Sequence, residues 1–163
     1  MNKRAFGALG LFAISLRGIA SQLAPPVDAC GLLSAIDVEQ ALHVRIDGSG
    51  PRVHLPSITS CVFTHGGEMR ASVVLHRNVS DAWAASQKQR MSVSGTYRSI
   101  TDLGNPGFIW DRGTNGATAC LFLDSDYLQI SVFGAGARRN ELLTITRKAL
   151  AGLSGSPHLA TRP

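Results

Sequence analysis

The sequence predicts an α+β domain, an antiparallel β-sheet with helices packed on one face, in the order α-β-β-α-β-β-β-α and with one disulfide. Three observations favour this class: a helix-start signal near residue 34, short segments separated by Gly-, Asn- and Asp-rich turns, and an amphipathic C-terminal segment. With 163 residues, 44% of them hydrophobic, the chain is long enough to bury a single core.

Local signals predict the individual elements. Ser34 is placed to cap the first helix, and Asp37 three residues later completes a capping box. Gly66-Gly67 separates two alternating segments and predicts a hairpin turn. Residues 44–56 show no sustained period, so a loop with a short strand around Val53 is expected there. The expected helices cover residues 35–43, 81–91 and 142–153, and the expected strands cover residues 60–64, 69–76, 97–101, 107–111, 119–123 and 127–133.

The first residues have the pattern of a secretory signal peptide. The positive tripeptide Asn2-Lys3-Arg4 precedes an apolar run over residues 5–16, which is too short to span a bilayer. Small residues predict cleavage after Ala20. The alternative is a cytosolic protein with an apolar first helix. The expected organisation is a signal peptide over residues 1–20, a spacer over 21–29, a single domain over 30–154 and a flexible tail over 155–163.

The cysteine content fits an oxidising compartment. An exported chain with cysteines at positions 30, 61 and 120 is expected to form one disulfide, and three pairings are possible. We favour Cys30 with Cys61, because each lies at the edge of a predicted element. Cys120, in an apolar strand-like segment, is then expected to be a buried and unreactive thiol.

The segment from Cys30 to Leu42 resembles a family of small exported bacterial domains of unknown function. Members open with Cys-x-Leu-Leu-Ser/Thr, as in Cys30-Gly31-Leu32-Leu33-Ser34, and are often lipoproteins. They are similar to the extracellular sensor domains of bacterial Ser/Thr kinases. The likeness continues at Cys61-Val62-Phe63, at Asp102-Leu103-Gly104-Asn105 and at Ala149-Leu150-Ala151. The resemblance implies a fold and an exported location but no catalytic residues, and this chain departs from it in lacking a lipidation signal.

Charge does not indicate a nucleic-acid partner. Lys3, Arg4 and Arg17 supply three of the five net positive charges, which leaves +2 for the rest of the chain. The remaining basic residues are scattered, and no aromatic residues alternate with them as in a nucleic-acid groove.

No residue pattern predicts catalysis, a metal or a cofactor. The histidines at positions 43, 54, 65 and 76 recur every eleven residues, which is not a ligand spacing, and His65 and His76 are expected to be solvated. Asp124 and Asp126 are expected to be turn residues that bond their own backbone. Glycines 134 and 136 are expected to be hinges rather than a phosphate loop. The large aromatic side chains are expected in the core, namely Trp83, Trp110, Phe108 and Tyr97.

These observations predict an exported, non-enzymatic binding or sensor-like module, periplasmic or secreted. Its partner is expected to be another protein or a cell-envelope component, with membrane contact only during export. The outward residues of the second predicted strand are the expected contact surface, in particular Arg70, Val74 and His76. The alternatives are a periplasmic inhibitor or immunity protein that occludes an enzyme, and a hydrolase with a dispersed site.

Overall fold

The computed structural model describes residues 27–92, 96–134 and 139–154 and confirms the α+β class. The helices are α1 (Ala35–Leu42), α2 (Asp81–Ser92) and α3 (Arg139–Ser154), with two short 3-10 helices, η1 (Ala29–Gly31) and η2 (Gly113–Asn115). The strands are β1 (Gly48–Leu55), β2 (Ile58–His65), β3 (Glu68–His76), β4 (Thr96–Ile100), β5 (Gly107–Asp111), β6 (Gly116–Leu123) and β7 (Asp126–Phe133). The predicted signal peptide, residues 21–26 of the spacer and the predicted tail lie outside the described residues.

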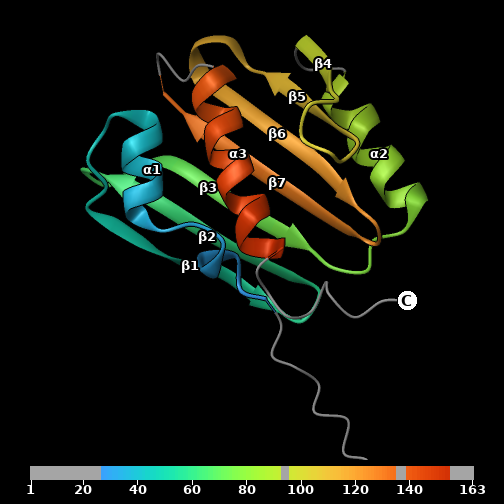
Figure 1. Ribbon diagram of the computed structural model, residues 1–163, viewed down its shortest axis with the longest axis horizontal. Helices are drawn as coiled ribbons and strands as arrows, with labels where there is room; N and C mark the ends of the chain where they lie inside the picture. The colour runs from blue at the N-terminus through green and yellow to red at the C-terminus, as the bar shows by residue number, and fades with distance from the viewer. Residues whose placement is uncertain (1–26, 93–95, 135–138, 155–163) are drawn as a thin grey trace, which may run out of the picture.

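All strands belong to one antiparallel sheet in the order β1-β2-β3-β7-β6-β5-β4 (Figure 1). The pairing of β3 with β7 joins the three strands before α2 to the four strands after it. The predicted alternation of helices with groups of strands is confirmed, although the predicted order counted two strands before α2 and three after it. Every helix and strand range expected from the sequence is present, with its ends shifted by at most a few residues.

Strand β1 extends well beyond the short strand that the sequence predicts around Val53. Most of the segment expected to be a loop is a strand from Gly48 to Leu55, paired along its length with β2. The strand lies at the edge of the sheet, where Pro51 is tolerated because one side of the strand needs no hydrogen-bonding partner. Its register shifts between Pro51 and Val53, and most of its side chains are exposed. Because the side chains of this edge strand do not alternate regularly between buried and exposed, its sequence lacks the alternating pattern that identifies a strand.

One side of the sheet, which we call the first face, packs against α1 and α3. Figure 1 shows these two helices side by side across the same side of the sheet, and they contact each other. The core between helices and sheet is aliphatic. The central strands supply Ala71, Val73, Leu75, Leu128, Ile130 and Val132, and the helices supply Val38, Leu142, Ile145 and Ala149, all of them inaccessible to solvent.

The opposite side, the second face, packs against α2, so the prediction that all helices share one face is wrong for α2. Because strand side chains alternate between faces, Phe108, Cys120 and Tyr127 point away from the first-face core and form a separate buried cluster. Trp83 and Met91 of α2 pack against this cluster. Only Ala84 of α2 is itself buried, so the helix has no apolar stripe from which its position could be predicted.

The start of the domain is held to the first face by the predicted disulfide. Cys30 and Cys61 are bonded, with their Cα atoms 4.9 Å apart, and the amide of Ala29 donates to Thr59 Oγ1 on the same strand. The predicted capping box is also confirmed: Asp37 N donates to Ser34 Oγ, and Ser34 N donates to the Asp37 carboxylate. None of the described helices is both long and apolar enough to cross a membrane.

Candidate functional site

The residues predicted as a contact surface share the second face of β3. Ala71, Val73 and Leu75 fill the first-face core, so Arg70, Ser72, Val74 and His76 project to the other side. These four side chains are half-buried. The structure therefore places Arg70, Val74 and His76 on one surface, but their surroundings differ from one another.

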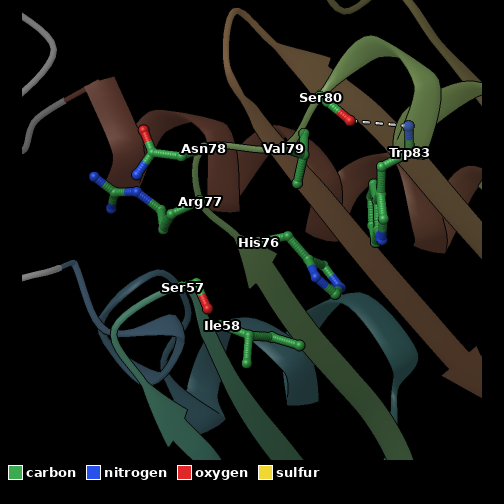
Figure 2. A pocket seen from close by; sticks show the side chains of 8 residues that line it. All are labelled: Ser57, Ile58, His76, Arg77, Asn78, Val79, Ser80 and Trp83. Carbon is green, nitrogen blue, oxygen red and sulfur yellow. Dashed lines mark hydrogen bonds between the residues drawn. The ribbon is translucent and has the colours of Figure 1, made fainter.

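His76 lies in the wall of an open depression with a volume of about 540 Å³. Figure 2 shows Ile58 and Ser57 on one side of it, Val79 opposite, and the rings of His76 and Trp83 next to each other. The lining comes from the end of β3, the start of α2 and the connections beside them, and consists of Ser57, Ile58, His76, Arg77, Asn78, Val79, Ser80 and Trp83.

His76 is not the solvated side chain expected from the sequence. Its ring centroid lies 4.7 Å from that of Trp83 and 5.8 Å from that of Tyr127. Trp83 and Tyr127 in turn meet edge-on at 5.2 Å. Burial lowers the pKa of His76, so the imidazole is neutral at pH 7. Sequence alternation placed His76 on the polar face of its strand, but could not reveal that a helix covers that end of the strand.

The segment between β3 and α2, which forms one rim of the depression, is held by two distant turns. Arg77 N donates to Ser57 O at 2.9 Å, and Val79 N donates to Ser125 O at 2.7 Å. The backbone of Asn78 is in a left-handed conformation, with φ of 54°, and its backbone N–H donates to Asp126 Oδ1 at 3.1 Å.

The Asp126 carboxylate therefore holds the connection between β3 and α2. Besides accepting the Asn78 amide, its carboxylate lies 2.9 Å from Nε of Arg77 in an ion pair whose side chains are mostly buried. The prediction that the Asp126 side chain bonds its own backbone is wrong, because the fold brings Asn78, 48 positions away, within hydrogen-bonding distance.

A second region of the same face extends from the depression along β3. Ile58 pairs with His76, and the next residues on this face, Ser60 and Val74, are also opposite each other. On the other side of β3, Val74 pairs with Gln129 of β7. We call the half-buried residues Val62, Arg70, Ser72, Val74 and Gln129 the contact face; none of them belongs to either buried apolar cluster.

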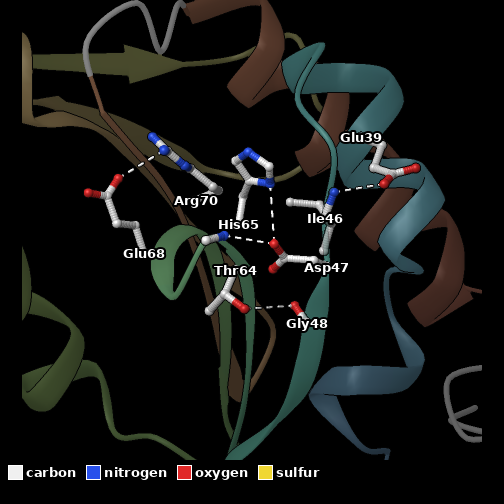
Figure 3. A network of polar contacts seen from close by, with 9 residues as sticks. Glu39, Ile46, Asp47, Gly48, Thr64, His65, Glu68 and Arg70 are labelled. Carbon is white, nitrogen blue, oxygen red and sulfur yellow. Dashed lines mark hydrogen bonds and ion pairs between the residues drawn. The ribbon is translucent and has the colours of Figure 1, made fainter.

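The far end of the contact face is ordered by polar contacts around the β2–β3 turn (Figure 3). Arg70 Nη2 binds Glu68 Oε2 at 2.8 Å. Asp47 accepts the amide of Gly66 at 2.7 Å, and its carboxylate lies 3.4 Å from Nδ1 of His65. His65 remains 40% exposed, so the expectation of a surface side chain holds better for it than for His76.

The aromatic residues expected in the core divide between the interior and this surface. Phe108 is inaccessible to solvent, whereas Trp83, Tyr97 and Trp110 are half-buried. The guanidinium of Arg112 lies 5.3 Å from the ring centroid of Trp110 and 4.8 Å from that of Phe133, and burial lowers its pKa. Sequence reasoning missed this cation–aromatic group because Phe133 of β7 is far in sequence from Trp110 and Arg112.

Cys120 is the buried thiol that the sequence predicts. It is inaccessible to solvent, and burial raises its pKa to about 12, which leaves it protonated and unreactive at neutral pH. Its sulfur lies 3.6 Å from Sδ of Met91, beneath α2. Burial also raises the pKa of the neighbouring Tyr127.

Within residues 27–92, 96–134 and 139–154, no three His, Cys, Asp or Glu side chains are grouped so that they could hold a metal ion. Of the two glycines expected as hinges, Gly134 is described, with φ of 101°, and Gly136 lies outside the described residues. No protein-family model matches the sequence, and no curated protein is significantly similar to it. The family resemblance suggested by the Cys30 motif remains a prediction.

Proposed function

We propose that the domain is an exported, non-enzymatic binding module whose partner, a protein or a cell-envelope component, contacts the depression and the adjoining contact face. The observation that carries this proposal is the continuity of the two regions: Ile58 and His76 of the depression adjoin Ser60 and Val74 on the same strands. Together they present aromatic, aliphatic, amide and guanidinium groups, a mixture typical of recognition surfaces.

The chemistry of the depression supports binding rather than turnover. Its titratable lining residues are His76, which is neutral at pH 7, and Arg77, which is paired with Asp126. No carboxylate is among the lining residues of the described chain that could orient or receive a proton from His76. The disulfide supports a location outside the reducing cytoplasm.

The proposal is tested by photo-crosslinking in the native host. A photoreactive amino acid at Val74 is expected to give covalent adducts of higher mass. The matched control carries the same amino acid at Ile36, an apolar residue of α1 that is 61% exposed and lies on the first-face side. Adducts from both positions alike, or no adduct from Val74, would contradict a specific surface on the second face.

The partner's identity then separates the binding module from an inhibitor. If the adduct contains a hydrolytic enzyme and the purified domain blocks its activity, the inhibitor function replaces the more general one. The compartment is tested independently by mass spectrometry of the mature N-terminus, which is expected at Ser21. An intact Met1 in the cytoplasm would contradict export.

A further inference from the structure

We propose that the depression binds a neutral saccharide unit, such as a hexose or N-acetylhexosamine of a cell-envelope glycan. This inference rests on the proposed function and specifies the ligand of the same surface. A pyranose ring has an apolar C–H face and a rim of hydroxyl groups, so its site needs an aromatic or aliphatic platform beside uncharged polar groups. The depression provides both.

The platform consists of four half-buried apolar or aromatic side chains. Ile58, Val79 and the rings of His76 and Trp83 surround the depression (Figure 2). The two rings are tilted by 46° to each other, so they form an angled wall rather than a flat stack. Apolar lining with a few placed polar groups is the usual composition of a small-molecule site.

Polar groups at the rim are free to bind hydroxyls. Among the residues that the structure describes, the side chains of Ser57, Asn78 and His76 form no hydrogen bond with one another or with other residues. Ser57 and Asn78 are exposed, and their hydrogen bonds within the fold are made by the backbone. A purely apolar guest would leave these donors and acceptors unpaired where it excluded water, which is unfavourable.

The depression is electrically balanced, which favours an uncharged ligand. The positive charge of Arg77 is compensated by Asp126 at 2.9 Å, and Figure 2 shows the Arg77 side chain directed away from the His76 and Trp83 rings. His76 is neutral, since its pKa is lowered by burial. The described lining of the depression therefore offers no unpaired charge to which an acidic or a basic sugar could bind.

The site is also rigid before a ligand arrives. Trp83 and His76 both rest on the buried ring of Tyr127, at centroid distances of 5.2 and 5.8 Å. The Arg77–Val79 rim is fixed by backbone hydrogen bonds to Ser57 and Ser125. Little conformational entropy is therefore lost on binding, which helps a weakly interacting ligand.

Trp83 is itself the reporter for the test. In a Trp110→Phe variant of the mature chain, Trp83 is the one remaining tryptophan. Titration with a neutral chitooligosaccharide is expected to shift the indole emission, with a Kd on the order of 1 mM. Glucuronic acid and glucosamine serve as charged probes, and N-acetylphenylalanine amide serves as an uncharged aromatic probe.

Calorimetry on variants locates the binding site. Trp83→Ala is expected to weaken oligosaccharide binding by at least about tenfold. Because this variant also loses packing, a second variant keeps the test decisive: Ser57→Ala with Asn78→Gly removes the rim side chains while glycine suits the left-handed backbone at position 78. Ser49→Ala, an exposed residue of β1 outside both the depression and the contact face, is the matched control and is expected to bind as the parent does.

The outcomes separate the two proposals. Absence of an emission shift at about 10 mM oligosaccharide, equal binding of a charged sugar, or binding of N-acetylphenylalanine amide alone would overturn the saccharide assignment. Crosslinks from Val74 would in those cases still support the binding module. Saccharide binding with no specific Val74 adduct would support this site and contradict the broader surface.

Discussion

The two faces of the sheet are built from different side chains and are covered to different extents. On the first face, two contacting helices seal an aliphatic core, and a disulfide ties the start of the domain to β2. On the second face, one helix with a single buried residue rests on aromatic rings, and the strands beside it keep half-buried polar and apolar side chains. The contrast indicates that stability is concentrated on the first face, which leaves the second face available for recognition.

The largest expected effect comes from removing the disulfide on the first face. Replacing both Cys30 and Cys61 by alanine opens a cross-link between residues separated by 31 positions. On the chain-entropy model this lowers the free energy of unfolding by about 3 to 4 kcal/mol. Urea denaturation followed by circular dichroism measures it. Cys120→Ala, which removes no cross-link, should cost much less, and equal losses would contradict the role given to the bridge.

Substitutions of two neighbouring residues on the central strand β7 compare the contribution of each face to stability. Ile130 is inaccessible in the first-face core, and Gln129 is half-buried on the second face. Ile130→Ala should lower the unfolding free energy by about 3 kcal/mol through lost contacts and a residual cavity. Gln129→Ala should change it by less than about 1 kcal/mol. If both substitutions cost the same, the proposed division between the faces is wrong.

Loss of Trp83 should have an intermediate effect. Trp83→Ala removes the ring that covers His76 and Tyr127, and because that ring is half-buried the cost should be about 2 kcal/mol, below that of a fully buried tryptophan. Exposing His76 should also return its pKa toward the usual range, which NMR titration of the imidazole would detect. An unchanged His76 titration would show that α2 does not cause its desolvation.

The smallest effect is expected at the contact between the two first-face helices. Lys148 of α3 lies 2.6 Å from Asp37 of α1, and this hydrogen bond, with those from Ser34, lowers the pKa of Asp37 to about 2. Because the folded pKa lies below the unfolded value of 3.8, the stabilisation is present above pH 4 and is lost as the pH falls toward 2.

Partial solvent exposure screens that contact, so Asp37→Asn should cost about 1 kcal/mol at pH 7. Denaturation curves of variant and parent across this range should converge at the acidic end. A difference that does not depend on pH would show that the capping geometry, rather than the charge, provides the stabilisation.

The sequence by itself was sufficient for most of the local structure. Alternation in residues 69–76, the Gly66-Gly67 turn and the Ser34–Asp37 box each depend on neighbouring residues, and each is present as expected. The cysteine pairing was also predictable, because an expected oxidising compartment favoured one disulfide and Cys30 and Cys61 each lie at the edge of a predicted element. Where β1 lies, only a short strand around Val53 was expected, since an edge strand with exposed residues has no period to detect.

The tertiary structure alone decided which face α2 covers and where the depression lies. The weak apolar pattern of α2 does not specify a face, whereas the contacts of Trp83 and Met91 with Tyr127 and Cys120 do. The depression combines Ser57 of one turn, His76 of β3 and Trp83 of α2, and its rim is held by Ser125 and Asp126. The periodicity of a segment depends on which of its side chains face the core, so it can be detected locally. Contacts between distant segments depend on strand order and side-chain packing, which leave no short-range pattern in the sequence.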